Sequence, residues 1–366
     1  MRAIVLSGSI SLIIALLGTP LFIRYLRRRE YGQFIRQDGP ESHHVKRGTP
    51  TMGGVVIVLA TLFGWLLGNV VVGRTPNVSS VLVVGLMVGL GFVGFLDDAI
   101  KLTRERSLGL NATWKIILQG VVGISFGLLA LRFPDEQGIT PASTAISFLR
   151  DTVVDLAVLG PALGLIAFVV WANFLITAWS NAVNLTDGLD GLATGAAIIF
   201  FGAYVLVNIW QSNQLCGVNN TDLATCYEVR DPRDLAILAA ALAGACFGFL
   251  WWNASPAKIF MGDTGSLAIG GAIAGLTIIS RTELLGAIIG GLFVIIVASS
   301  VLQIGYFKIT KGKRIFKMAP LHHHFELMGW GEVTIVTRFW IIAGLFAGLG
   351  IGVFYAEWVA NLGLDG

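Results

Sequence analysis

Runs of about 20 consecutive, mostly apolar residues recur along the whole chain. A helix of that length is what crosses the hydrocarbon core of a bilayer. Hydrophobic residues make up 55% of the chain and charged residues 13%, whereas soluble proteins carry roughly 25% charged residues. The runs are continuous rather than alternating, which argues against a β-barrel. The sequence therefore predicts an all-α, polytopic membrane protein.

About ten membrane-spanning helices are expected, and no soluble domain separates them, so residues 1–366 are expected to form one integral membrane domain. The first run is too long for a signal-peptide core and no cleavage site follows it, so we expect it to be retained. The segment 133–160, between two runs, is expected to form a short amphipathic or hairpin element. The expected spans are 4–25, 53–73, 80–96, 114–132, 161–182, 192–210, 234–252, 264–281, 285–307 and 335–359.

The basic residues predict the orientation. Most of the 25 Lys and Arg residues fall in the loops on one side of the ten spans, and such loops are normally cytoplasmic. Both termini are then extracytoplasmic, as is the loop that holds Cys216 and Cys226. Disulfides form in that compartment, but the sequence leaves open whether these two cysteines pair.

The motif "FLDDAIK" places Asp97 and Asp98 at the end of the third span, with Lys101 one helical turn later. Neighbouring residues on a helix point about 100° apart, so the two carboxylates should face different partners, one of them a cation or a proton. The simpler alternative is a solvated helix end with an ordinary i,i+3 ion pair.

Two further motifs follow apolar spans on the same predicted side. In "NLTDGLDGLA", Asn184, Asp187 and Asp190 alternate with glycines that allow a tight backbone beside a ligand. The spacing excludes an EF-hand, and the alternative is a plain polar turn. In "NASPAKIFMGDTGS", the "GDTGS" stretch could offer backbone N–H groups at a helix N-terminus to phosphate, and Phe260 could stack on a base.

The segment "PLHHHFE" contains His322, His323 and His324, three of only five histidines in the chain. A tag remnant is excluded by its position inside a loop between spans. A zinc site is disfavoured because adjacent histidines do not converge on one ion. A structural role for one of the three stays open. We expect the imidazoles to orient phosphate or sugar oxygens, His322 and His323 more than His324.

Carboxylates, lysines and glycine-rich turns thus gather at one membrane face, the predicted cytoplasmic one. Mg²⁺ takes oxygen ligands, often one or two carboxylates, and leaves the rest of its shell to phosphate and water. The segment "KRGTPTMGG" lacks the Gly-Lys-Ser/Thr of a Walker loop, which excludes P-loop hydrolysis. The pattern indicates Mg²⁺-assisted chemistry on phosphates, and a site at the membrane edge implies a lipid substrate.

These five segments resemble the signature motifs of the polyprenyl-phosphate N-acetylhexosamine-1-phosphate transferases. Within that superfamily, "GTPTMGG" with an uninterrupted "PLHHHFE" is similar to the phospho-N-acetylmuramoyl-pentapeptide transferases. The motifs occur in the family's order, and the resemblance covers nearly the whole chain.

The resemblance implies a Mg²⁺-dependent enzyme of a bacterial plasma (inner) membrane. It would transfer phospho-MurNAc-pentapeptide from UDP-MurNAc-pentapeptide to undecaprenyl phosphate, giving lipid I and UMP, the first membrane step of peptidoglycan synthesis. A homodimer is expected, and no nucleic-acid partner. The alternative is a sister enzyme that uses UDP-GlcNAc. A secondary transporter is disfavoured, since transporters place their polar sites near the bilayer midplane.

The resemblance also assigns roles to matching positions. Asp263 matches the magnesium-binding aspartate, Asp97 and Asp98 the catalytic pair, and Asp187 a third essential carboxylate; His322 and His323 are also expected to be catalytic. Residues expected to bind substrate are Lys46, Asp190, Asn253 and Phe260 around the uridine, together with Thr51, Lys101, Lys115, Asn184, Gln303 and His324.

Two mechanisms remain open. In the favoured one, the lipid phosphate attacks the donor directly and Asp97 removes any remaining proton from it. In the other, Asp98 forms an aspartyl-phosphate intermediate.

Overall fold

The computed structural model describes residues 1–29, 48–104, 109–219, 222 and 225–362. Within these residues, ten helices are long and apolar enough to cross a membrane, as the apolar runs predict. They are α1 (Arg2–Arg28), α2 (Gly54–Val71), α3 (Val78–Thr103), α4 (Ala112–Ala130), α5 (Pro161–Thr186), α6 (Leu192–Asn213), α7 (Pro232–Asn253), α8 (Gly262–Ile279), α10 (Gly291–Ile309) and α12 (Glu332–Leu362). The chain is an integral membrane protein.

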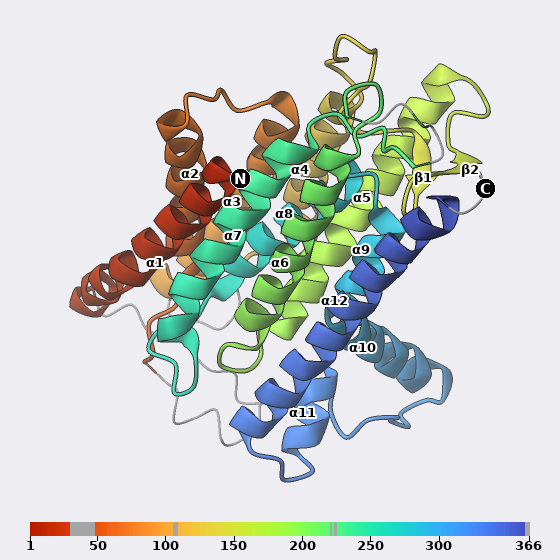
Figure 1. The fold of residues 1–366 in the computed structure, drawn as a ribbon. Helices are drawn as coiled ribbons and strands as arrows, with labels where there is room; N and C mark the ends of the chain where they lie inside the picture. Colours follow the sequence, from red (N-terminus) through yellow and green to blue (C-terminus); the bar gives the residue numbers. More distant parts are fainter. Residues whose placement is uncertain (30–47, 105–108, 220–221, 223–224, 363–366) are drawn as a thin grey trace.

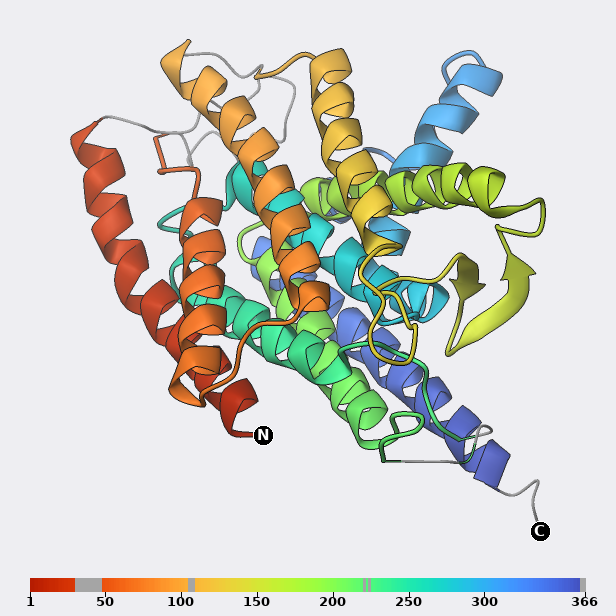
Figure 2. The ribbon, with the colours of Figure 1, turned by 90° about the horizontal axis from the view of Figure 1, so that it is seen from above.

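The expectation of an all-α fold is wrong in one place. The segment 133–160 contains an antiparallel hairpin of β1 (Ala145–Ser147) and β2 (Asp151–Asp155), with Ser147 opposite Asp151. This hairpin is one of the two forms predicted for the segment. It lies at the edge of the bundle opposite α1 (Figure 2).

The expectation of one continuous span over 285–307 is also wrong. The chain forms the short helix α9 (Glu283–Ile289), breaks at Gly290, and continues as α10 in a different direction (Figure 1). A Cβ at Gly290 would overlap the indole of Trp179 on α5. The apolar pattern continues through the break, and the only local signal of it is the pair Gly290 and Gly291, where the backbone is free to bend.

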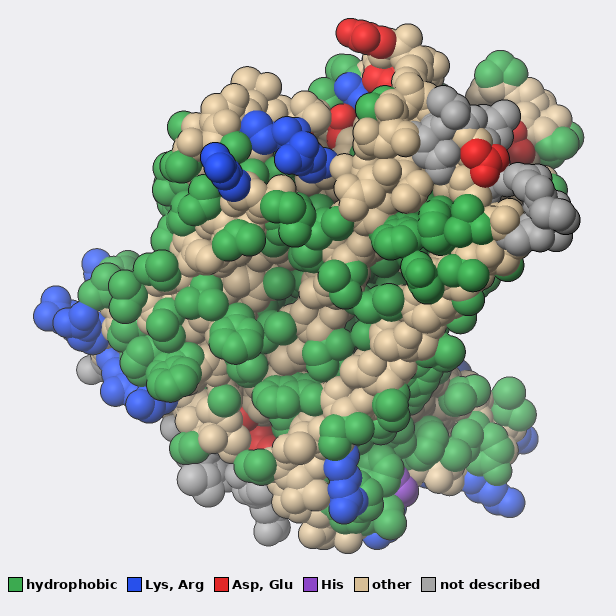
Figure 3. All heavy atoms as spheres, in the orientation of Figure 1, with side chains coloured by type: hydrophobic (Ala, Val, Ile, Leu, Met, Phe, Trp, Pro, Cys, Tyr) green, Lys and Arg blue, Asp and Glu red, His purple; other side chains and the backbone are tan. Residues whose placement is uncertain are grey.

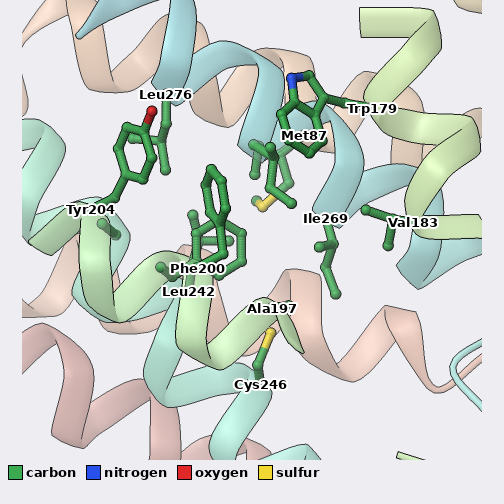
Figure 4. Close-up of a cluster of buried hydrophobic side chains, with 14 of the residues drawn as sticks. Met87, Trp179, Val183, Ala197, Phe200, Tyr204, Leu242, Cys246, Ile269 and Leu276 are labelled. Carbon is green, nitrogen blue, oxygen red and sulfur yellow. The ribbon is translucent and has the colours of Figure 1, made fainter. Parts of the chain in front are cut away.

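Helix α8 lies at the centre of the bundle, in contact with α3 and α5, and every residue from Thr264 to Ile279 is buried. Small residues fill much of it, which lets neighbouring helices approach closely. The adjoining core brings side chains of α3, α5, α6, α7 and α8 together, among them Met87, Trp179, Phe200 and Ile269 (Figure 4).

Two glycines bring other helices against the first turn of α8. A Cβ at Gly94 of α3 would overlap the carbonyl group of Asp263, and a Cβ at Gly54 of α2 would overlap the backbone of Gly265. The backbones of α2 and α3 therefore touch the N-terminus of α8. This contact sets Asp97 and Asp98, one turn after Gly94, beside Asp263.

The two ends of the bundle differ. One end holds both termini, the hairpin and the α6–α7 connection, and the other holds α11 (Leu321–Glu326) (Figure 1). Hydrophobic side chains dominate the surface between them, and charged side chains gather toward the ends (Figure 3). Cys216 and Cys226, whose pairing the sequence left open, form a disulfide in the α6–α7 connection.

The close approach of α3 and α8 yields a prediction. Gly94→Ala should lower the free energy of unfolding by about 1–3 kcal/mol, the usual cost of over-packing, because the added methyl group meets backbone. Gly85→Ala, on the same helix, is the control. Its Cβ meets open space, so it should be neutral or slightly stabilising. Denaturation in mixed micelles measures both, and equal effects would contradict the assigned contact.

Candidate active site

Asp98 binds the N-terminus of α8. Its Oδ1 accepts a hydrogen bond from the N–H of Asp263 (3.2 Å). Its Oδ2 accepts from the N–H of Thr264 (2.9 Å) and from the Thr264 hydroxyl (2.7 Å). A carboxylate at this position also complements the partial positive charge of a helix N-terminus. Asp98 is 2% exposed, so it anchors α8 to α3 inside the protein.

Asp97 faces a different partner, as the helical geometry predicts. Its Oδ1 accepts a hydrogen bond from the N–H of Leu110 (2.9 Å), and its Oδ2 lies 2.6 Å from Nζ of Lys101. Asp97 is also buried, and Lys101 lies closer to it than to Asp98 (3.8 Å). The alternative of a solvated helix end with an i,i+3 pair is therefore wrong.

Asp263 lies between two lysines and an amide. Its Oδ2 is 3.1 Å from Nζ of Lys101 and 2.8 Å from Nζ of Lys115. Its Oδ1 accepts a hydrogen bond from Nδ2 of Asn184 (2.7 Å). Oxygens of Asp97, Asp98 and Asp263 all lie within 4.8 Å of one another. Asp97, Lys101, Asn184 and Asp263, predicted for the site from three motifs, thus meet beside the first turn of α8, together with Asp98 and with Lys115 from outside the motifs.

The expectation that "GDTGS" offers its N–H groups to phosphate is corrected. The helix begins at Gly262, and the N–H groups of Asp263 and Thr264 donate to Asp98. Which acceptor satisfies a helix N-terminus depends on the helix packed beside it, and the motif alone carries no information on that.

Asp187 and Thr51 flank the cluster. Asp187 follows the last residue of α5, and although part of its side chain reaches the surface, loss of hydration raises its pKa well above the usual range. The negative charges of Asp263 and Asp98 raise that pKa further, while a hydrogen bond with the backbone of Gly262 lowers it. Thr51 is buried, and a Cβ on Gly262 would lie 3.0 Å from its Oγ1 and 2.6 Å from Oδ2 of Asp98.

The residues predicted around a uridine lie in adjoining loops. Oδ2 of Asp190 accepts a hydrogen bond from the N–H of Ala257 (2.9 Å), which joins the α5–α6 and α7–α8 turns. Asn253 accepts from the Thr194 hydroxyl (2.7 Å) and donates to the carbonyl of Ile259 (3.0 Å). At 2% exposure, Asn253 holds the α7–α8 turn in place.

Phe260 in the same turn is partly exposed. Its backbone pairs with the segment before α2, through Pro50 (2.8 Å) and Gly53 (2.9 Å). Lys46, the remaining residue predicted near the uridine, lies outside the described residues.

The three histidines differ in environment. The segment predicted as a loop forms the short helix α11. His322 is fully buried, and a Cβ on Gly188 would overlap its ring, so it packs on the turn next to Asp187. Nδ1 of His323 lies 2.6 Å from Glu326, and Nδ1 of His324 accepts from the N–H of Lys317 (3.0 Å). His324 faces the α10–α11 loop rather than the carboxylates.

Gln303 organises the same loop. Its Oε1 accepts hydrogen bonds from the N–H groups of Ile315 and Phe316 (both 3.0 Å), and its Nε2 donates to the carbonyl of Phe316 (3.1 Å). Gln303 lines a cavity of about 710 Å³ between α10 and this loop. The cavity reaches Leu185, the residue after Asn184.

Three residues with clear roles in this geometry are absent from the predicted set. Thr264 donates twice to Asp98, Glu332 accepts from the N–H of Asp190 (2.9 Å), and Glu326 pairs with His323. Thr264 and Glu326 lie inside recognised motifs. Glu332, which begins α12, has no local signal beyond a carboxylate in the first turn of a helix.

The carboxylate cluster fits a hard divalent cation. Asp97 and Asp263 supply oxygen donors next to each other, and the amide of Asn184 lies beside them. Mg²⁺ prefers such oxygens, whereas Zn²⁺ prefers thiolates and imidazoles. Two lysines at the same place add positive charge that can bind phosphate oxygens.

The Asp98 anchor yields a prediction. Thr264→Val removes one hydrogen bond to a charged group and should lower the free energy of unfolding by about 1.5–3 kcal/mol. Thr277→Val is the control on the same helix, because that hydroxyl donates only to the carbonyl of Ala274 (2.9 Å). Its loss should cost about 1 kcal/mol or less. A loss in Thr264→Val no larger than that in the control would contradict the assigned anchor.

Comparison with known proteins identifies the family of the chain. Residues 80–281 match the family model of glycosyl transferase family 4, and residues 46–58 match signature 1 of the phospho-N-acetylmuramoyl-pentapeptide-transferases. The protein of that name from Beutenbergia cavernae is 67% identical over 99% of this chain and 100% of its own length. Those from Kineococcus radiotolerans and Streptomyces avermitilis are 64% and 58% identical, each over 99% of this chain and 100% and 99% of their own lengths.

The motifs, the cluster of carboxylates that they form and the full-length relatives agree: this chain belongs to the phospho-N-acetylmuramoyl-pentapeptide-transferases of glycosyl transferase family 4.

Proposed function

We propose that this protein transfers phospho-MurNAc-pentapeptide from UDP-MurNAc-pentapeptide to undecaprenyl phosphate, forming lipid I and releasing UMP. The observation that carries the proposal is the meeting of Asp97, Asp263, Lys101 and Lys115 at one end of a membrane-spanning bundle. Such a site can bind phosphates while the acceptor's hydrocarbon chain stays in the bilayer. Relatives of this name match the chain over its full length.

A divalent cation, Mg²⁺ in the cell, would be held by Asp263, with Asp97 as the second nearby carboxylate. When bound, it would supply positive charge that offsets the negative charge developing on the departing UMP phosphate. Lys115 and Lys101 would bind the phosphate oxygens of the donor. Asn184 keeps the carboxylate of Asp263 oriented through its 2.7 Å hydrogen bond.

In the proposed reaction, an oxygen of undecaprenyl phosphate attacks the phosphorus that carries the sugar. The bond from that phosphorus to the UMP oxygen breaks, and UMP leaves with the electron pair. Asp97 accepts any proton that remains on the acceptor phosphate, a modest contribution because the second pKa of a phosphate monoester is near 6. Catalysis then rests on positioning and charge neutralisation, as is usual for phosphoryl transfer.

The geometry of Asp98 favours direct attack over an aspartyl-phosphate intermediate. Both its oxygens accept hydrogen bonds from the N-terminus of α8, and only 2% of the residue is exposed. A nucleophile would need a free and accessible oxygen. We therefore assign Asp98 to holding Asp263 in place.

We assign the neighbouring loops to substrate binding. Phe260, Asp190 and Lys46 would surround the uridine, with Asn253 holding their loop. Asp187 and Thr51 border the phosphates. His322 and His323 would contribute to catalysis from the other side of the Gly188 turn.

The acceptor has a fitting cavity beside α10. The 710 Å³ cavity is lined by Lys308, Arg314 and Lys317 and by apolar residues that include Ile304 and Phe307. Ile304 and Phe307 are exposed on α10, so the cavity joins a basic region to a face that can contact lipid. This pairing suits a long-chain lipid phosphate.

Two further observations support the proposed orientation. The loops at the end that carries the carboxylates are rich in Lys and Arg, which favours the cytoplasm. The opposite end carries the Cys216–Cys226 disulfide, which favours an oxidising compartment. The site would face the cytoplasm of a bacterium and both termini the outside, and the enzyme would act as a homodimer in the plasma membrane.

The assay is release of UMP by the purified protein in lipid nanodiscs. We expect release to require UDP-MurNAc-pentapeptide, undecaprenyl phosphate and Mg²⁺ together, and Asp263→Asn to lower it about 100-fold or more, the usual effect of removing a main electrostatic contribution. Glu136→Gln, an exposed acid at the opposite end, should leave it unchanged. UMP release without any acceptor would contradict the proposed transfer.

The sister reaction is tested by the choice of donor. With UDP-GlcNAc in place of UDP-MurNAc-pentapeptide, we expect UMP release at or near background. Turnover of UDP-GlcNAc alone would instead assign the chain to the sister activity.

A further inference from the structure

Lys101 occupies the centre of the carboxylate cluster. Its Nζ lies 2.6 Å from Oδ2 of Asp97, 3.1 Å from Oδ2 of Asp263 and 3.8 Å from Oδ1 of Asp98. These are the three carboxylates whose oxygens come within 4.8 Å of one another. The ammonium group of Lys101 therefore occupies the position at which a divalent cation would contact the largest number of carboxylate oxygens.

Both carboxylate oxygens of Asp263 already have partners in the protein. Oδ2 contacts both Lys101 and Lys115, and Oδ1 accepts the hydrogen bond from Asn184. Oδ2 has room for two partners and contacts two lysines. Mg²⁺ needs oxygens at about 2.0–2.1 Å, so an ion that binds Oδ2, the oxygen nearest the other carboxylates' lysine, must replace one of the two ammonium groups. Among the described ion pairs, Lys115 contacts Asp263 alone, whereas Lys101 spans the whole cluster.

Lys101 is also the lysine whose side chain can move away from the carboxylates. It lies in the last turn of α3, and its side chain is 31% exposed, so it can turn outward without disturbing the helix packing. A lysine has a flexible four-carbon stem and needs no fixed geometry at its charge. Asp98, by contrast, is held by α8 and cannot rearrange to make room.

We propose that Lys101 takes the cation's place in the substrate-free enzyme and is displaced when the divalent ion binds. It then turns to the phosphate oxygens of the donor. This inference rests on the proposed function for the identity of the ion and the donor. The lysine prevents the buried carboxylates from facing one another uncompensated, which would be costly.

One consequence concerns affinity. Ion and Lys101 compete for the same oxygens, so the ion binds weakly until a pyrophosphate offers Lys101 another anionic partner. By linkage, donor and ion then strengthen each other's binding by the same factor.

The test is Mn²⁺ binding to the substrate-free protein in nanodiscs, followed by electron paramagnetic resonance. Lys101→Met keeps the length of the side chain without its charge. It should bind Mn²⁺ at least about tenfold more tightly than the wild type, yet release UMP at least about tenfold more slowly. Arg104→Gln removes an exposed positive charge at the end of the same helix and should change Mn²⁺ affinity less than about twofold. Unchanged or weaker Mn²⁺ binding by Lys101→Met would overturn the proposal.

A second measurement needs no variant. Saturating Mn²⁺ should make the Lys101 amine of the wild type several times more reactive toward an acylating reagent, as read by mass spectrometry, while exposed Lys258 stays constant. Equal labelling of Lys101 with and without Mn²⁺ would overturn the inference. Wild-type protein that shows these Mn²⁺ effects but releases no UMP would refute the proposed function and leave the competition intact.

Discussion

The pairing of the Asp98 carboxylate with the N-terminus of α8 is the interaction on which the site depends. It connects two membrane-spanning helices through three hydrogen bonds in a region shielded from water. The first residues of a helix have N–H groups without partners in the helix, and leaving them unpaired inside a membrane protein is expensive. Asp98 satisfies two of them and thereby fixes Asp263 at the end of the most buried helix of the bundle.

Close backbone contact makes this pairing geometrically feasible. Gly94 and Gly54 allow α3 and α2 to touch the first turn of α8. Gly94 lies one turn before Asp97 and Asp98, so packing and chemistry are encoded in the same short stretch of α3. Lys101 and Lys115 also compensate the negative charge of Asp97 and Asp263, which are largely removed from solvent.

The sequence was sufficient to predict the membrane-spanning helices and to predict that the motifs lie on the same side of the membrane. Ten apolar runs of bilayer length leave few alternatives, and motifs that end alternate spans must lie on one side of the membrane. The span layout therefore predicted one membrane face for the motifs, and the family resemblance assigned Asp97, Lys101, Lys115, Asn184 and Asp263 to one site.

Features that depend on contacts between helices could not be predicted from the sequence. The close contact of Gly290 with the indole of Trp179 on α5 joins positions far apart in the chain. The same holds for the N–H groups of "GDTGS", which bind Asp98, and for Asn253, whose amide is used by Thr194 and Ile259. Motifs identify which side chains matter, but only the packing decides whether each one contacts a ligand or another residue.

The most direct test of the assigned site is the contact between a bound divalent ion and the donor's phosphates. It can be measured as the ³¹P hyperfine coupling of Mn²⁺ in the protein with UDP-MurNAc-pentapeptide bound. We expect a resolved coupling, which requires a phosphate oxygen on the ion, and its loss in Asp263→Asn. Bound Mn²⁺ without ³¹P coupling in the presence of saturating donor would contradict a site in which these carboxylates bring the ion to the pyrophosphate.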